Sequence, residues 1–320
     1  MYFPVSGVDV NPIIPFAVSF IISFFTSMGG VSGSFLLLPF QISILGYTSP
    51  GVSSTNLLYN VIAVPGGVYR YIREGRMAWP LAWLIIAGTL PGIFIGVIIR
   101  IRYLSDIQNF KYFVGAVLFY LAVRIFYDLT PLAGKKITRA AALERGFQGK
   151  ANQAPADNGS PPEKFRFIRT INVSWNKYTF EFYGELFSLN IISLFLFTFM
   201  IGILGGAYGI GGAAIIAPFL LTFFGLPVYA IAGATLTANF ITSIAGVLFY
   251  LLIAPFYKTS GISITPDWFL GIILGLGGFM GIYLGAATQR YFPARIIKIL
   301  LAIISLFLSL EYLLNLYLNK

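Results

Sequence analysis

The sequence predicts an all-α integral membrane protein, a polytopic helical bundle made of two homologous repeats, and three observations lead to this fold class. The 320 residues are 58% hydrophobic and only 10% charged, which is a membrane composition. Two long blocks, residues 10–69 and 186–257, contain no Asp, Glu, Lys or Arg. A glycine-rich motif opens each half of the chain, so an internal repeat determines the architecture.

The duplicated motif reads Ser-Met-Gly-Gly-Val-Ser-Gly-Ser at residues 27–34 and Gly-Gly-Ala-Tyr-Gly-Ile-Gly-Gly at residues 205–212. An offset of 179 residues matches five positions: Gly30, Gly33, Pro39, Phe40 and Gly46 with Gly209, Gly212, Pro218, Phe219 and Gly225. At the same offset Asn60 matches Asn239, each close to several hydroxyl residues. After an insertion of ten residues a glycine series matches as well: Gly88, Gly92 and Gly96 with Gly277, Gly281 and Gly285.

Each repeat is expected to begin with a broken pair of helices. In the first half these are residues 13–27 and 34–45, separated by the glycine motif and followed by a third helix over about 53–71. The segment 34–45 and its counterpart 213–224 are too short to cross a membrane, which takes about 20 helical residues. Irregular backbone at membrane depth is tolerated only where protein or a watery cavity satisfies it, so matching breaks in two repeats indicate a transporter site.

Full spans are expected to follow in both halves. Residues 79–99 match 268–289, and their glycines at every fourth position predict close helix packing rather than contact with a substrate. The last spans are expected at about 112–129 and 296–317. Near the end of the first of these, Arg124 and Asp128 lie four residues apart, which indicates a surface ion pair, with a coupling-ion site as the alternative.

Between the halves lies a polar, basic stretch from about residue 134 to residue 178. Its middle, residues 153–162, has the composition of a flexible linker. Because basic loops stay in the cytoplasm, we assign residues 133–184 to a cytoplasmic insertion between a first repeat, 1–132, and a second, 185–320. The repeats are expected to have inverted topology with both termini outside, although a parallel arrangement fits the charges nearly as well.

Composition also excludes several classes of function. The chain has no cysteine and no histidine, which removes thiol catalysis, disulfides and the commonest metal ligands, so no metal or cofactor is expected. The net charge of +10 is explained by the positive-inside rule, and no nucleic-acid partner is expected. No signal peptide is expected either, because Asp9 but no Lys or Arg precedes the first apolar segment.

With its doubled glycine motif, its two asparagines and its glycine-lined spans, the sequence resembles the sulfite exporter TauE/SafE family of membrane permeases. The resemblance covers both halves and leaves the insertion outside it. It implies movement of small sulfur-containing anions, such as sulfite and organosulfonates. The first copy of the motif departs from the Gly-Ile-Gly-Gly form of the second, since it has Ser32 where the second has Gly211.

The glycine loops suggest how an uncharged core holds an anion. Two helix N-termini offer N–H groups and positive dipole ends, and nearby hydroxyls and amides add donors. Gly33 and Gly212 are expected to give the anion close access to the backbone. The candidate substrate-binding residues are Gly29, Gly30, Ser32, Gly33, Ser34, Ser54, Thr55, Asn60, Gly209, Gly211, Gly212, Thr235, Thr237 and Asn239. The alternative is that these residues only pack and bond neighbouring helices.

Export is the simpler direction, because each negative charge leaving a cell gains about 2.3 kcal/mol per 100 mV and neither uncharged block holds a carboxylate for coupling. An anion channel remains an alternative. A membrane enzyme acting on a lipid-soluble substrate is a second one, disfavoured because no nucleophile–base pair or metal cluster is present. The expected setting is the plasma membrane, with membrane lipids as partners, and the sequence leaves open whether the chain forms a homo-oligomer.

Overall fold

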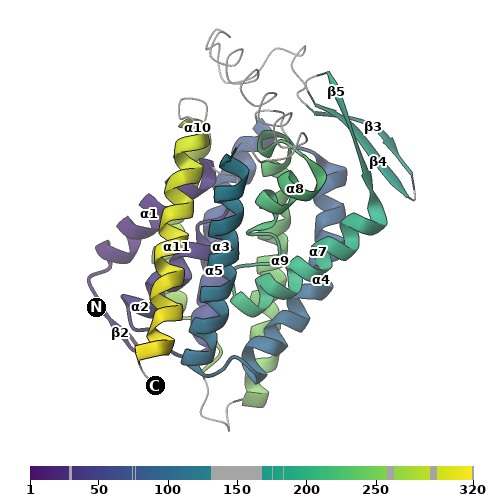
Figure 1. Cartoon of the computed structure of the whole chain (residues 1–320). Helices are drawn as coiled ribbons and strands as arrows, with labels where there is room; N and C mark the ends of the chain where they lie inside the picture. Colours follow the sequence, from purple (N-terminus) through teal and green to yellow (C-terminus); the bar gives the residue numbers. More distant parts are fainter. Residues whose placement is uncertain are drawn as a thin grey trace.

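The computed structural model describes residues 1–28, 31–73, 75, 77–130, 168–174, 176–182, 184–257, 263–288 and 294–318. These residues form a helical bundle with a small sheet at one end and both chain termini at the other (Figure 1). Six helices of the described part are long and apolar enough to cross a membrane. The predicted fold class, a polytopic helical membrane protein, is therefore confirmed.

The first half contains a short hairpin and five helices: β1 (Tyr2–Phe3), β2 (Val8–Asp9), α1 (Ile13–Met28), α2 (Ser34–Ser43), α3 (Gly51–Arg73), α4 (Trp79–Arg102) and α5 (Ile107–Leu129). The predicted break between the first two helices is confirmed. The fifth helix begins five residues earlier than the expected start near residue 112. Asp106 explains the difference, because its carboxylate caps the helix by accepting from the N–H groups of Gln108 and Asn109, both at 2.9 Å.

The second half contains three strands and five helices: β3 (Ile168–Val173), β4 (Lys177–Phe182), β5 (Glu185–Asn190), α7 (Ile191–Tyr208), α8 (Ile216–Phe224), α9 (Val228–Tyr257), α10 (Trp268–Thr288) and α11 (Ala294–Leu318). The expected start of the short helix at Ala213 is wrong by three residues. Residues up to Ile215 form a turn, and the Ile216 N–H bonds back to the Ala213 carbonyl at 3.2 Å. At its other end the helix stops at Gly225, whose φ of 69° is left-handed.

The strands were not predicted from the sequence. The three strands before α7 form an antiparallel sheet in the order β3-β4-β5. Residue 184, the last residue of the predicted insertion, lies between β4 and β5, so the sheet spans the predicted boundary between the insertion and the second repeat. Every second residue of β4, namely Tyr178, Phe180 and Phe182, is buried, as expected for a strand with one covered face. The Phe180 ring stacks on Phe187 of β5, with centroids 5.5 Å apart. The expected flexible linker, residues 153–162, lies outside the described residues.

The helices of the two halves pack against each other in an exchanged pattern. Helix α1 packs on α10 and α7 packs on α4, while α3 contacts α10 and α9 contacts α4. Glycines make this possible: in α10, Gly277, Gly281 and Gly285 face the backbone of Phe16, Phe20 and Phe24, and in α4, Gly88, Gly92 and Gly96 face that of Phe195, Phe199 and Ile203. The predicted packing role of these glycines is confirmed, and the contacted residues in α1 and α7 are themselves 179 apart.

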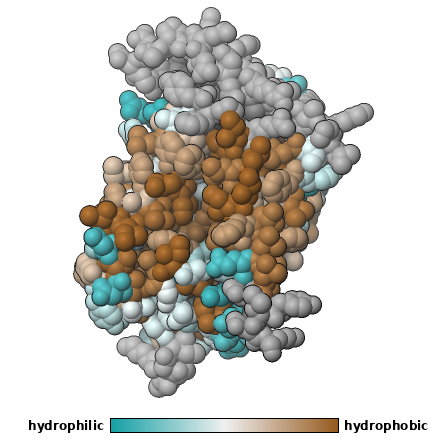
Figure 2. Space-filling model, turned by 60° about the vertical axis from the view of Figure 1, so that its left-hand side comes forward, coloured by the Kyte–Doolittle hydropathy of each residue, from teal (hydrophilic) through white to brown (hydrophobic). Residues whose placement is uncertain are grey.

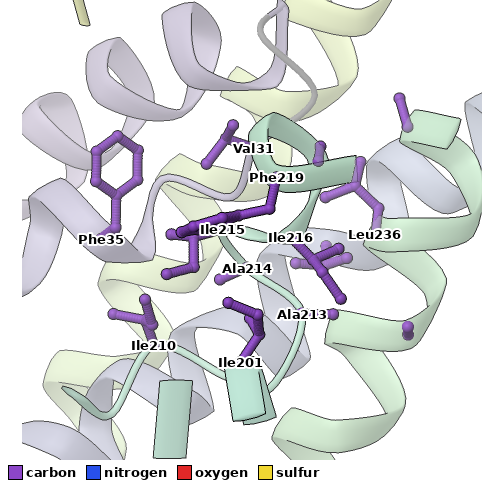
Figure 3. Packing of buried hydrophobic residues seen from close by; sticks show 14 of the residues in the cluster. Val31, Phe35, Ile201, Ile210, Ala213, Ala214, Ile215, Ile216, Phe219 and Leu236 are labelled. Carbon is purple, nitrogen blue, oxygen red and sulfur yellow. The ribbon is translucent and has the colours of Figure 1, made fainter. Parts of the chain in front are cut away.

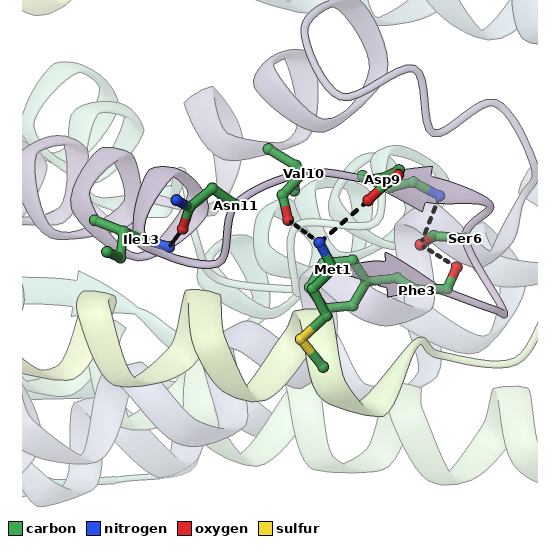
Figure 4. Close-up of polar contacts among 8 residues, drawn as sticks. Met1, Phe3, Ser6, Asp9, Val10, Asn11 and Ile13 are labelled. Atoms are coloured by element: carbon green, nitrogen blue, oxygen red, sulfur yellow. Dashed lines mark hydrogen bonds and ion pairs between the residues drawn. The ribbon is translucent and has the colours of Figure 1, made fainter.

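One end of the bundle gathers the N-terminal hairpin and the starts of α3 and α10. The Gly51 N–H donates to the Ser263 carbonyl at 3.0 Å, and the Ser6 hydroxyl donates to the Asp267 carboxylate at 2.8 Å. The hairpin is closed by the Met1 ammonium, which lies 3.1 Å from a carboxylate oxygen of Asp9 and 3.0 Å from the Val10 carbonyl oxygen (Figure 4). These contacts hold the N-terminal hairpin at the end of the bundle opposite the sheet. We call this the N-terminal end of the bundle.

Between the two ends the outer surface is apolar. Figure 2 shows a broad region of hydrophobic residues across the middle of the molecule, with hydrophilic residues mostly near its ends. Large apolar side chains such as Trp83, Leu252 and Phe307 are more than half exposed. Contiguous apolar surface of this kind is typical of a region that faces lipid.

Candidate functional site

The two glycine loops, one before α2 and one before α8, meet inside the bundle. The Ser32 N–H donates to the Ala214 carbonyl oxygen at 3.4 Å, and the Ser34 hydroxyl donates to the Ile210 carbonyl oxygen at 3.0 Å. Buried apolar side chains surround this contact (Figure 3): Val31, Phe35, Ile201, Ile210, Ala213, Ala214, Ile215, Ile216, Phe219 and Leu236. We call residues 31–34 and 209–215 the loop crossing. The predicted site residues Gly29 and Gly30 lie outside the described residues.

Two amides of α3 hold the loops together. Asn60 donates to the Ile210 carbonyl at 2.7 Å and accepts from the Ser32 hydroxyl at 2.6 Å. Asn56 donates to the carbonyl oxygens of Gly209, at 2.9 Å, and Ser34, at 3.0 Å. Asn56 was not predicted as a site residue, although it lies four residues before Asn60 and therefore on the same helix face. In the first copy the polar groups thus satisfy one another.

The second copy is different at the matching asparagine. Asn239, in α9, is buried, yet neither its Oδ1 nor its Nδ2 has a hydrogen-bond partner among the described residues. The hydroxyl of Ser243, one turn further along the helix and also buried, lacks a partner as well. A buried polar group without a partner costs about 1–3 kcal/mol, so such groups in a native structure call for a ligand or water.

Gly211 explains why Asn239 is left without a partner. It stands where the first copy has Ser32, whose hydroxyl bonds to Asn60, and it has no side chain to offer. A Cβ on Gly211 would collide with Asn239 Oδ1 and lie 2.7 Å from Ser243 Oγ. The two unpartnered side chains therefore face the backbone of the second loop directly, at the position where a side chain is missing.

The glycines of the crossing have different conformations. Gly209 and Gly211 have φ values of 81° and 92°, in the left-handed region that favours glycine. Gly33 has a φ of −60°, and a Cβ there would lie 2.7 Å from the Tyr59 hydroxyl. A Cβ on Gly212 would lie 2.9 Å from Thr89 Cβ, and its N–H already donates to Thr242 Oγ1 at 3.2 Å. The last two glycines are therefore packed against protein side chains.

Two predicted hydroxyl residues, Ser54 and Thr55, bond away from the crossing, at the N-terminal end of the bundle. The Ser54 hydroxyl donates to the Ile264 carbonyl at 2.8 Å, and the Thr55 hydroxyl accepts from the Asp267 N–H at 2.8 Å. Tyr47 lies 3.2 Å from the same threonine oxygen, and burial raises the pKa of this tyrosine, which keeps it protonated. These residues join α3 to the start of α10.

The predicted threonines of α9 are also used within the protein. Thr235 donates to the Ala232 carbonyl at 3.1 Å, and Thr237 donates to the Gly233 carbonyl at 2.9 Å. Thr237 also lies 3.6 Å from the sulfur atom of Met77, just before α4. Of the predicted residues, those at the crossing are Ser32, Gly33, Ser34, Gly209, Gly211 and Gly212, with Asn60 and Asn239 in contact with it.

A family model described as sulfite exporter TauE/SafE matches residues 15–312, which include both loops, both asparagines and all the long helices except the last residues of α11. The chain belongs to this family. No curated protein and no solved structure matches the chain. Together with the six candidate spans, family membership identifies a multi-pass membrane protein of a family of transport permeases. The loop crossing lies wholly inside the region that defines the family.

Proposed function

We propose that the protein exports a small sulfur-containing anion, sulfite or an organosulfonate, across the plasma membrane and binds it at the loop crossing. The observation that carries the proposal is the pair of buried, unpartnered side chains, Asn239 and Ser243, beside Gly211. They lie where two broken helices meet, which is where transporters with repeated halves bind their substrates. Membership of a family of sulfite exporters supports the chemical class of the substrate.

The available donors suit an anion that has to be released again. The Asn239 amide and the Ser243 hydroxyl each offer hydrogen to a sulfite or sulfonate oxygen, and each such bond contributes about 1.5–3 kcal/mol. Both loops lie in blocks without Lys or Arg, so no full positive charge from these blocks adds to the binding. The N-cap residues Gly33 and Ile215 make no side-chain cap bond, although the Ser34 N–H of α2 donates to Ser32 Oγ at 3.4 Å, so the N-terminal ends of these helices add a favourable dipole.

Alternating access needs two halves that rock around the bound anion, and inverted repeats supply them. One contact supports inversion. The start of α3 lies beside the start of α10 at the N-terminal end, although α10 is the counterpart of α4 and not of α3. The exchanged packing of α1 on α10 and of α7 on α4 is the pattern that a two-fold axis relating the halves produces, whichever way that axis runs. With Arg70 and Arg73 inside, both termini lie outside.

The test is flux through purified protein in liposomes, measured for sulfite, taurine, sulfoacetate, sulfate and chloride. We expect saturable movement of sulfite or a sulfonate, and Asn239→Ala should weaken its binding about ten- to a hundred-fold by removing a bond to a charged ligand. Thr235→Ala is the matched control, since that hydroxyl bonds only within α9. Transport by Asn239→Ala at the rate and affinity of the unmodified protein would refute the site.

A channel would reveal itself in the same experiment, because its flux does not saturate at the low turnover of a carrier. Export is tested by imposing a membrane potential on the liposomes. If efflux of the anion rises when the interior is made negative, the potential drives export. If an inward sodium or proton gradient is required instead, the proposed direction is wrong.

A further inference from the structure

Arg100 is a fully buried arginine near the end of α4. Its Nε donates to Ser53 Oγ at 3.0 Å and its Nη1 donates to the Leu104 carbonyl oxygen, while the guanidinium carbon lies 3.6 Å from the centroid of the Phe110 ring. Its Nη2 has no hydrogen-bond partner, and among the described residues no carboxylate pairs with it.

Such an arrangement is energetically unusual. Burying a charge without a counter-ion is costly, and the ring of Phe110 and the carbonyl end of α4 offset only part of that cost. An ionisable side chain inside a membrane protein therefore indicates a functional site. Leu104 and Ser53 accept from two of the three guanidinium nitrogens, and the third, Nη2, has no acceptor among the described residues.

A second unpartnered donor lies nearby on α9. Tyr250 is fully buried, and its hydroxyl lies close to Ser53 and to the Arg100 guanidinium but makes no hydrogen bond of normal geometry among the described residues. The Ser53 hydroxyl, which is close to both groups, accepts from Arg100 and keeps its own hydrogen to donate. One cationic and two hydroxyl donors therefore lie close together, and no carboxylate among the described residues is bonded there.

One face of α9 runs from these donors to the loop crossing. Asn239, Ser243 and Tyr250 are separated by four and seven residues, which bring side chains back to one face of a helix. All three have polar atoms without a partner in the described part of the chain. Eleven residues of helix measure about 16 Å, so the stripe leads from the crossing toward the N-terminal end of the bundle.

We propose that Arg100, Tyr250 and Ser53 form a second oxyanion site, next to the loop crossing, which Ser53 meets at Gly209, and on the side of the bundle that carries the N-terminus. The ligand is a small oxyanion such as sulfite or a sulfonate, because guanidinium Nη2 and the phenol hydroxyl together match two oxygens of one anion. A lipid headgroup is not the source of the oxyanion, since the arginine is shielded from the surface. The site does not depend on the proposed transport, although an exported anion would reach it next.

Binding of sulfite to full-length protein in non-ionic detergent tests the proposal, with affinity read from the concentration dependence of the thermal unfolding midpoint. The protein should carry Asn239→Ala, so that the crossing contributes little. In this background Arg100→Gln should weaken sulfite binding about ten- to a hundred-fold, and Tyr250→Phe should weaken it in the same direction. Arg100→Lys should recover part of the affinity, since it restores the charge without the planar fork.

Tyr312→Phe is the matched control. That tyrosine is also buried, but its hydroxyl already lies 2.9 Å from Ser43 Oγ, so its loss should leave sulfite affinity unchanged. If Arg100→Gln fails to fold, Tyr250→Phe decides the question on its own. Sulfite affinity that is equal with and without the Tyr250 hydroxyl, or no sulfite binding at all in the Asn239→Ala background, would overturn the second site. If the transport proposal is wrong instead, sulfite flux in liposomes is the same with and without Asn239→Ala.

Discussion

Ser32 and Gly211 occupy the same position in the two copies of the repeat. In the first copy the serine hydroxyl bonds to Asn60, which then holds the second loop through Ile210. In the second copy the glycine leaves Asn239 free of any partner in the described structure. The asparagine therefore holds the two loops together in the first copy, and the matching asparagine of the second copy remains available as a hydrogen-bond donor.

Gly211→Ala tests this asymmetry. The new methyl group would collide with Asn239 and would also sit at a left-handed φ of 92°, which costs a non-glycine residue about 1–2 kcal/mol. We expect sulfite flux to be lost because the amide is displaced. Flux in liposomes, normalised to folded protein by size-exclusion chromatography, is the measurement.

Gly46→Ala separates strain from collision. Gly46 has a φ of 70°, but no atom lies within 4 Å of the position that a Cβ would take, so its replacement brings the backbone strain alone. This variant should transport like the unmodified protein, with a slightly lower unfolding midpoint. Equal flux per folded molecule in the two variants would show that Asn239 has no part in transport.

Sequence reasoning found the glycine loops and both asparagines because these residues repeat at a fixed offset. It placed Ser54 and Thr55 at the site on proximity along the chain, whereas the fold turns them toward Ile264 and Asp267. It missed Arg100 because a basic residue at the end of an apolar span is normally a surface anchor. Only the packing of Phe110 over the guanidinium shows that this arginine is buried.

Among the elements, the long apolar helices were predictable and the element ends were less so. Helix α5 starts early because Asp106 supplies a side-chain cap, and α8 starts late because the second loop forms a turn up to Ile215. The sheet was missed because its strands lie within and just after a stretch rich in charge. The buried alternation along β4 is visible in the sequence once a strand is considered.

The glycine faces of α4 and α10 give a prediction at the same scale. A Cβ on Gly281 would lie 3.0 Å from both the Phe24 backbone nitrogen and the Ser23 Cβ, so Gly281→Ala should push α1 away from α10. We expect a clear fall in the thermal unfolding midpoint, because backbone-to-backbone contact leaves no flexible group that could yield. Leu276→Ala, on the half-exposed outer face of the same helix, is the control. Similar midpoints for the two variants would contradict the packing role.

For the whole molecule, the orientation of the two halves can be measured directly. The chain has no cysteine, so any introduced thiol is unique. Arg73 is the last residue of α3, and Tyr257 is the last residue of α9, the matching helix of the other half. Two variants, Arg73→Cys and Tyr257→Cys, place one thiol at each of these ends. With inverted repeats, an impermeant maleimide on intact cells should label the second variant and reach the first only after permeabilisation. Labelling of both from the same side would establish parallel repeats instead.

The exchanged packing of α1 on α10 and of α7 on α4 has a consequence for the history of the chain. The first long helix of each half packs on a helix of the other half, so neither half alone has a complete set of neighbours. Two copies of a single five-helix ancestor, inserted in opposite orientations, would make the same set of contacts between separate chains. Fusion of two such genes through the basic insertion would then have preserved an interface that already existed, and left the two copies free to diverge, as Ser32 and Gly211 have.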